Sequence, residues 1–155
     1  RDGWNIATKT DGTMWAWGKD NFGNLGINDY DSARSSPTQI PGTTWTTEFA
    51  AGRHTIAVKS DGTLWTWGNN FHGQLGQNSE IKRSSPVQIP GTTWSDAMTQ
   101  EYMVSMALKT DGTLWGWGSN YYGNIGLNDT TKRSSPTQIP GTWSILGRTM
   151  VLKEL

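Results

Sequence analysis

The chain has 155 residues and no net charge, because 13 lysines and arginines balance 13 aspartates and glutamates. A neutral chain lacks the positive surface that grips a phosphate backbone, which argues against a nucleic-acid partner. Its ten tryptophans argue against disorder, and its lack of cysteine excludes disulfides and thiolate metal sites. No apolar run approaches the length of a membrane span.

The chain is a threefold repeat with a period of about 50 residues. Asp-Gly-Thr begins at residues 11, 61 and 111, and Trp-x-Trp-Gly, a pair of glycines and Arg-Ser-Ser-Pro-x-Gln-Ile-Pro-Gly-Thr follow in that order each time. A tryptophan closes each copy, at Trp45, Trp94 and Trp143. We therefore expect one repeat domain over residues 1–155, with units of approximately 1–50, 51–100 and 101–146.

Each unit is expected to contain a β-hairpin at its Asp-Gly pair. In the second unit, stretches rich in β-branched and aromatic residues lie on both sides of the pair at 61–62. Asp-Gly suits a two-residue type I′ turn, which predicts that Val58 lies opposite Trp65 and Ile56 opposite Trp67. Both faces of such a sheet carry apolar side chains, so neighbouring sheets must cover both.

The remainder of each unit predicts further short strands. The glycine pairs mark tight bends, and the proline-flanked Pro-x-Gln-Ile-Pro stretch suits an edge strand because proline cannot donate to a sheet ladder. The segment after the closing tryptophan, as at 45–50, can supply another strand. About four strands per unit without helical periodicity is typical of a β-propeller blade. The predicted fold class is all-β: three blades of about four antiparallel strands.

Three blades make an incomplete ring, because closed propellers typically have about 4–8 blades. Two apolar blade faces then stay open, and apolar faces of that size need a partner. Residues 147–155 resemble the first strand of a further blade, and the chain begins at Arg1 inside the first repeat. We therefore expect a processed product or a segment of a longer protein, with the ring closed by another chain or by a missing segment.

The order of the motifs resembles the regulator of chromosome condensation repeat family. The middle unit carries Ala-Gly-Arg-His-Thr-Ile-Ala at 51–57, Asp-Gly-Thr at 61–63 and Trp-Gly-x-Asn-x-x-Gly-Gln-Leu-Gly at 67–76, and Pro-Val follows at 86–87. The resemblance implies propeller blades. The first unit departs from the pattern with Asp20 in place of asparagine, and the third lacks the Gly-x-His pattern.

The resemblance to this family leaves several functions open. The family includes an exchange factor for a small nuclear GTPase, and many tandem copies resemble parts of virion and surface proteins of bacteria and phages. The Ser-Ser-Pro-x-Gln-Ile spelling of this chain is most similar to that last group. No segment matches the wedge that the exchange factor uses.

No pattern in the sequence indicates catalysis, a metal or a cofactor. His54 and His72 occupy different repeat positions and have no acidic pair beside them. Turn chemistry explains the recurring Asp11, Asp61 and Asp111. The repeated serine pairs have no matching histidine. We therefore predict a protein that is not an enzyme.

Two groups of residues are candidates for binding. Loops on a rigid scaffold commonly carry function, and the aromatic and amide residues after each Trp-Gly vary between units. Methionine fills adaptable interfaces, so a cluster of methionines predicts a seam with another chain. The candidate binding surface is Phe22, Asn70, Phe71, His72, Asn120, Tyr121 and Tyr122, and the candidate seam is Met98, Met103, Met106 and Met150.

The sequence thus favours a structural or interaction module, as in a virion or cell-surface assembly, that presents rigid loops to a protein partner or to further copies of itself. An extracellular or virion location is favoured. A lectin-like propeller that binds glycans in adhesion is the alternative, and a regulator of a small GTPase is a weaker one.

Overall fold

The computed structural model describes residues 3–100 and 103–144, which form eleven strands and no helix. All strand pairs are antiparallel, so the predicted all-β class is confirmed. The described part of the chain therefore holds no helix that could cross a membrane. The strands are β1 (Trp4–Thr8), β2 (Met14–Gly18), β3 (Arg34–Gln39), β4 (Trp45–Ala51), β5 (His54–Lys59), β6 (Leu64–Gly68), β7 (Arg83–Ile89), β8 (Trp94–Gln100), β9 (Val104–Lys109), β10 (Leu114–Gly118) and β11 (Arg133–Ile139).

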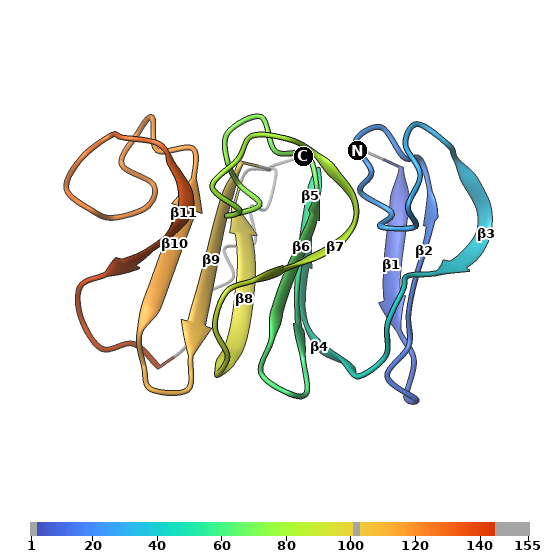
Figure 1. The fold of residues 1–155 in the computed structure, drawn as a ribbon, viewed down its shortest axis with the longest axis horizontal. Coiled ribbons are helices and arrows are strands. Elements are labelled where there is room, and N and C mark those ends of the chain that lie inside the picture. The colour runs from blue at the N-terminus through green and yellow to red at the C-terminus, as the bar shows by residue number, and fades with distance from the viewer. Residues whose placement is uncertain (1–2, 101–102, 145–155) are drawn as a thin grey trace, which may run out of the picture.

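The strands form three sheets that stand side by side in a row (Figure 1). The first sheet is β1-β2-β3, the second is β4-β5-β6-β7 and the third is β8-β9-β10-β11. Each four-stranded sheet begins at a closing tryptophan, Trp45 or Trp94, that follows the edge strand of the sheet before it. The first sheet has no such strand among the described residues, which is why it has three strands and not four.

The predicted hairpin register is wrong by one residue. Val58 pairs with Leu64 and Ala57 with Trp65, because the turn has three residues and includes Ser60. The Lys59 N–H donates to the Thr63 carbonyl at 2.9 Å. Asp-Gly also fits the last two positions of a three-residue turn, in which only the glycine takes a positive φ.

Gly62 has that conformation, with φ 78°. The shift changes which side chains share a face of the sheet. Trp65 and Trp67 now lie on one face with Ala57, and Ile56 and Leu64 lie on the other.

The proline-containing segments form β3, β7 and β11, which are edge strands as predicted. The tight bends at the glycine pairs are also present, since Gly23, Gly26 and their counterparts in the other two units all have positive φ. These bends return the chain from the end of each hairpin to the edge strand.

The hydrophobic core lies between the sheets. Between the first and second sheets it contains Met14, Leu25 and Ile40 on one side and Ala57 and Trp67 on the other. Between the second and third sheets, the fully buried Ile56, Leu64 and Ile89 meet Ala107 and Trp117. A third cluster, on the far side of the third sheet, consists of Val104, Leu108, Leu114, Ile125 and Ile139. The second and third sheets are thus apolar on both faces, as the sequence predicted for the second unit.

Candidate binding surfaces

The recurring aspartates hold the hairpin turns. The Asp61 carboxylate accepts hydrogen bonds from the Thr63 N–H at 3.0 Å and the Thr63 hydroxyl at 2.6 Å, and Trp65 Nε1 donates to the same hydroxyl oxygen at 2.8 Å. The first and third units repeat this arrangement. The hydrogen bonds from Thr63 lower the pKa of the Asp61 carboxyl. Turn geometry thus accounts for these three aspartates.

The two histidines lie in different environments. His54 is fully buried, and its Nε2 lies 2.8 Å from the Ser105 hydroxyl, which donates to the Gln74 carbonyl at 2.7 Å. This chain of contacts joins the second sheet to the third. His72 lies in a loop and packs edge-on against Tyr121, with ring centroids 6.0 Å apart. Over residues 3–100 and 103–144, no three His, Asp or Glu side chains come close enough to hold a metal ion.

Two residues of the candidate surface, Asn70 and Asn120, are buried. The Asn70 side-chain oxygen accepts the Leu75 N–H at 2.9 Å, and its Nδ2 donates to the carbonyls of Ser79 and Ile81 at 2.9 and 3.0 Å. Asn120 makes the corresponding contacts in the third unit. These amides organise the loops from inside.

The aromatic members of the candidate surface come together on neighbouring loops. Phe22 and Phe71 meet edge-to-face with centroids 6.1 Å apart, and His72 meets Tyr121 in the same manner. The exposed fractions are 59% for Phe71, 67% for Tyr121 and 90% for Tyr122. We call the set Phe22, Phe71, His72, Tyr121 and Tyr122 the aromatic band. It joins side chains from all three repeats into one surface.

The methionines of the candidate seam are only partly brought together. Met98 and Met106 are paired across β8 and β9 and pack, half-buried, against the apolar cluster of the third sheet. Met103 lies in the turn before β9 and is 37% exposed. Met150 lies outside the described residues.

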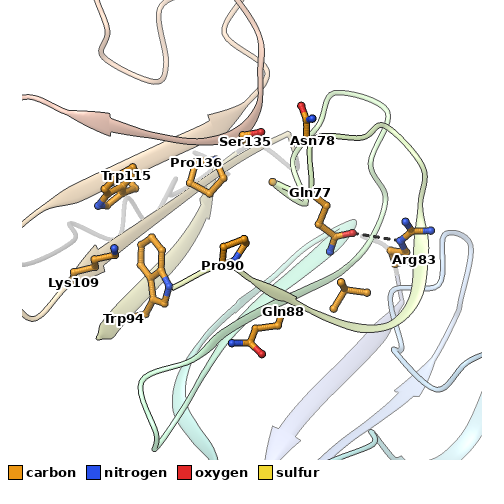
Figure 2. Close-up of a pocket in the computed structure, with 12 residues that line it drawn as sticks. Gln77, Asn78, Arg83, Gln88, Pro90, Trp94, Lys109, Trp115, Ser135 and Pro136 are labelled. Atoms are coloured by element: carbon orange, nitrogen blue, oxygen red, sulfur yellow. Dashed lines mark hydrogen bonds between the residues drawn. The ribbon is translucent and has the colours of Figure 1, made fainter. Parts of the chain in front are cut away.

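A groove at the junction of the second and third sheets was not predicted. Its volume is about 540 Å³, and the Lys109 ammonium lies 4.7 and 4.9 Å from the ring centres of Trp94 and Trp115. Pro90 and Pro136 lie beside the indoles, and Gln77 and Arg83 line the other end (Figure 2).

A smaller groove of about 250 Å³ repeats the same chemistry with Trp45, Lys59 and Trp65 at the junction of the first and second sheets. The buried Nε1 atoms of Trp45 and Trp94 have no hydrogen-bond partner among the described residues. The sequence pattern common to both grooves is Lys-x-Asp-Gly-Thr-x-Trp after a closing tryptophan. By itself this pattern indicates only a turn, and the groove becomes visible only in the folded structure.

Comparison with solved structures places the chain among β-propellers. Human WBSCR16 matches with a TM-score of 0.76 and 24% identity, over 89% of this chain and 36% of that one. Prp20p from Saccharomyces cerevisiae, studied for its binding to Gsp1p and histones, matches with a TM-score of 0.77 and 19% identity over 90% and 37%. Yeast RCC1 (Prp20) in complex with Kap60 gives a TM-score of 0.77 and 20% identity over 96% and 36%.

Because the identities are low, these likenesses establish the fold alone. The chain spans little more than a third of the matched chain in each of the three structures. The row of sheets is therefore an unclosed part of a propeller. No curated protein sequence matches the chain. The model of the regulator of chromosome condensation (RCC1) repeat matches residues 11–58, 61–98 and 111–146. The chain thus belongs to the RCC1 repeat family.

Proposed function

We propose that the chain is a non-enzymatic interaction module of a virion or cell-surface assembly, and that the aromatic band binds a protein partner. The observation that carries this proposal is the meeting of aromatic rings from three repeats on one surface, where Phe22 is half-buried and Phe71 and Tyr121 are exposed. Aromatic side chains dominate the energetics of protein interfaces because they bury a large area at low entropic cost. The rigid sheets beneath the loops hold the rings in place before a partner arrives.

The chemistry around the band also suits a protein surface. The Arg53 guanidinium lies 5.9 Å from the centre of the Phe22 ring, so a cation borders the apolar area. An apolar centre with a polar rim is the usual composition of a protein interface. A propeller of similar structure, Prp20p from yeast, was studied for its binding to Gsp1p and histones and was solved in complex with Kap60.

The test uses immobilised chain and extracts of cells or particles from the source organism. Proteins that the parent retains and the Tyr121→Ala/Tyr122→Ala variant loses are partners of the band, and we expect at least a tenfold loss of retention. Ile81→Ala is the matched control, because Ile81 is 63% exposed and lies outside the band. Equal retention by parent and double variant would contradict the proposal, as would measurable hydrolase or transferase turnover that survives purification.

A lectin-like function is the second candidate, and the repeated groove favours it. Indole and proline faces suit the C–H faces of a sugar ring, and Lys109, Gln77 and Gln88 offer polar groups around them. A glycan array tests this function. Binding that Gln88→Ala weakens would place the sugar in the groove, binding that Tyr121→Ala weakens would place it on the aromatic band, and an array without reproducible binding would exclude the glycans tested.

A further inference from the structure

The sheets are joined by a contact that occurs twice. Trp67 Nε1, in the second sheet, donates to the Asn24 carbonyl of the first at 3.0 Å, and Trp117 Nε1, in the third sheet, donates to the Gln74 carbonyl of the second at 2.8 Å. Both tryptophans are fully buried.

Each of these indoles lies directly over a glycine. A Cβ atom added to Gly26 would come within 2.5 Å of Trp67 Nε1, and one added to Gly76 within 2.7 Å of Trp117 Nε1. We call each indole with its carbonyl and glycine a tryptophan lock.

A second contact accompanies each lock. The Asn28 N–H donates to the Ser84 carbonyl at 2.7 Å, and the Asn78 N–H donates to the Ser134 carbonyl at 2.7 Å. In both cases a loop of one sheet reaches the edge strand of the next. The interface between neighbouring sheets is therefore a repeated unit. We call the face that carries the tryptophan indole the donor face, and the face that carries the glycine and the carbonyl bonded by the indole the acceptor face.

The first sheet carries an uncovered donor face. Trp17 is the counterpart of Trp67 and Trp117, yet it is only half-buried. Ala7 is exposed, whereas its counterparts Ala57 and Ala107 are fully buried. The side chains needed for a third lock are thus in position, and no other sheet of the described residues lies against them.

The third sheet carries the uncovered acceptor face. Gly126, the counterpart of Gly26 and Gly76, is exposed. Among residues 3–100 and 103–144, a Cβ atom added there would have only Ile139 within 4 Å, at 3.9 Å. In Figure 1 the first and third sheets lie at opposite ends of the row. One chain therefore presents a donor face at one end and an acceptor face at the other.

The closing tryptophan of the third unit also lacks the covering that its counterparts have. The Trp143 N–H donates to the Gly112 carbonyl at 2.9 Å, as its counterparts do to Gly12 and Gly62, but 42% of Trp143 is exposed, against 3% of Trp45 and of Trp94.

Trp45 packs against Lys59 and Trp65, and Trp94 packs correspondingly in the third sheet. In the first sheet, Lys9 lies over Trp15 at 4.0 Å with no closing tryptophan beside it in the described part of the chain. Trp143 and the Lys9–Trp15 pair are therefore the two halves of a third such cluster.

We propose that the donor face of one copy docks on the acceptor face of a second copy, so that Trp17 bonds the Asn124 carbonyl over Gly126 and Trp143 covers Lys9 and Trp15. The occupant is a second copy because the two open faces have the composition of the two sides of the internal interfaces. Two copies contribute six blades, within the range of about 4–8 that closed propellers have, whereas three copies would contribute nine. The expected assembly is a closed dimer with two identical interfaces.

The experiment measures the mass of the purified chain by sedimentation. We expect twice 17.1 kDa for the parent chain. Ala7→Glu introduces a charge on a residue that is exposed in the single chain, so it should leave folding intact and reduce the mass to that of a monomer. Gly126→Asn should act in the same way from the acceptor face, because asparagine tolerates a positive φ but fills the space that Trp17 needs.

The two blocked variants also test the direction of docking. Each keeps one intact face, so an equimolar mixture should again reach the dimer mass through a single interface. Trp17→Phe, which removes the indole N–H together with one of the two indole rings, should raise the dissociation constant at least about tenfold. Ser60→Glu is the control for added charge, since Ser60 is exposed at the hairpin turn of the middle sheet.

A parent chain that remains monomeric overturns the proposal, and so does a dimer that survives Ala7→Glu or a mixture of the two variants that does not associate. The inference is independent of the aromatic band, and Tyr121→Ala should leave the mass of the assembly unchanged. Loss of partner binding and loss of dimerisation can therefore be told apart.

Discussion

At position 20 the chain has a carboxylate where the other two repeats place an amide. Asp20 is buried, and desolvation raises the pKa of its carboxyl, with the nearby backbone N–H groups opposing this shift. Unlike Asn70, Asp20 has no amide group to donate to the loop carbonyls. The first loop therefore lacks two hydrogen bonds that the second loop has.

We expect Asp20→Asn to stabilise the chain by about 1–2 kcal/mol, because it adds hydrogen bonds to carbonyls of the loop and removes a buried charge. For a chain of this size the melting temperature should rise by roughly 3–6 °C. The reverse change, Asn70→Asp, is the matched control and should destabilise the second loop. Thermal unfolding of the three proteins measures both effects.

The gain from Asp20→Asn should depend on pH. A carboxyl with a raised folded-state pKa favours the folded state at pH values below its unfolded pKa, and this stabilisation is lost as the pH rises through the folded-state pKa. The melting temperature of the variant should therefore exceed that of the parent by a larger margin at pH 7 than at pH 4. An equal gain at both pH values would mean that burial of the charge is not the cause.

The turn aspartates predict a pH effect of the opposite sign. The hydrogen bonds from the threonine two residues later lower the pKa values of Asp11, Asp61 and Asp111. Their stabilisation is complete above the unfolded pKa and is lost as the pH falls through the folded-state pKa. The melting temperature of the parent should therefore fall in acid, and a variant with asparagine at all three positions should show a shallower decline.

The hairpins depend on one glycine each. Gly62 has a φ of 78°, and a Cβ atom there would lie 3.0 Å from the Thr93 backbone nitrogen, in the segment that leads into β8. Gly62→Ala should therefore cost more than the roughly 1–2 kcal/mol of the left-handed backbone alone. Gly3→Ala is the matched control, because Gly3 has a φ of 65° with nothing within 4 Å. Denaturant unfolding should show the larger loss for Gly62→Ala.

The same hairpins show how far the sequence predicts the fold. The prolines correctly marked β3, β7 and β11 as edge strands, because the missing N–H is a local property of the residue. Asp-Gly did not give the register, because it fits both a two-residue turn and a three-residue turn, and the structure has the longer turn that includes Ser60. A shift by one residue moves every side chain to the other face, so the face that carries Trp67 could not be predicted.

The candidate binding surface could be predicted only in part, because a local sequence pattern marks the loops but does not show which of their side chains are buried. Aromatic residues after Trp-Gly mark the loops, and the loops do carry the exposed Phe71 and Tyr121. The burial of Asn70 depends on hydrogen bonds to carbonyls nine and eleven residues away, which no local pattern reveals. The groove at Lys109 brings together β7 of the second sheet and all four strands of the third, so it exists only after the sheets are stacked.

The row of sheets should owe part of its stability to the tryptophan locks. Trp67→Phe leaves the buried Asn24 carbonyl without its donor, which should cost about 1–3 kcal/mol in the free energy of unfolding. Trp17→Phe should cost little in a monomeric chain, since Trp17 is half-buried and makes no such bond within residues 3–100 and 103–144. Both variants are measured by denaturant unfolding at a concentration where the chain is monomeric. Equal losses would show that the buried hydrogen bond contributes nothing.

The offset between repeats and sheets has a consequence for how such genes change in length. Each four-stranded sheet takes its first strand, β4 or β8, from the unit before it, so a 50-residue unit holds the end of one sheet and the start of the next. Recombination between two copies therefore adds or removes one complete sheet wherever the crossover falls within the unit. The junction that results has the same chemistry as the junctions already present, and copy number can vary without a new interface having to evolve.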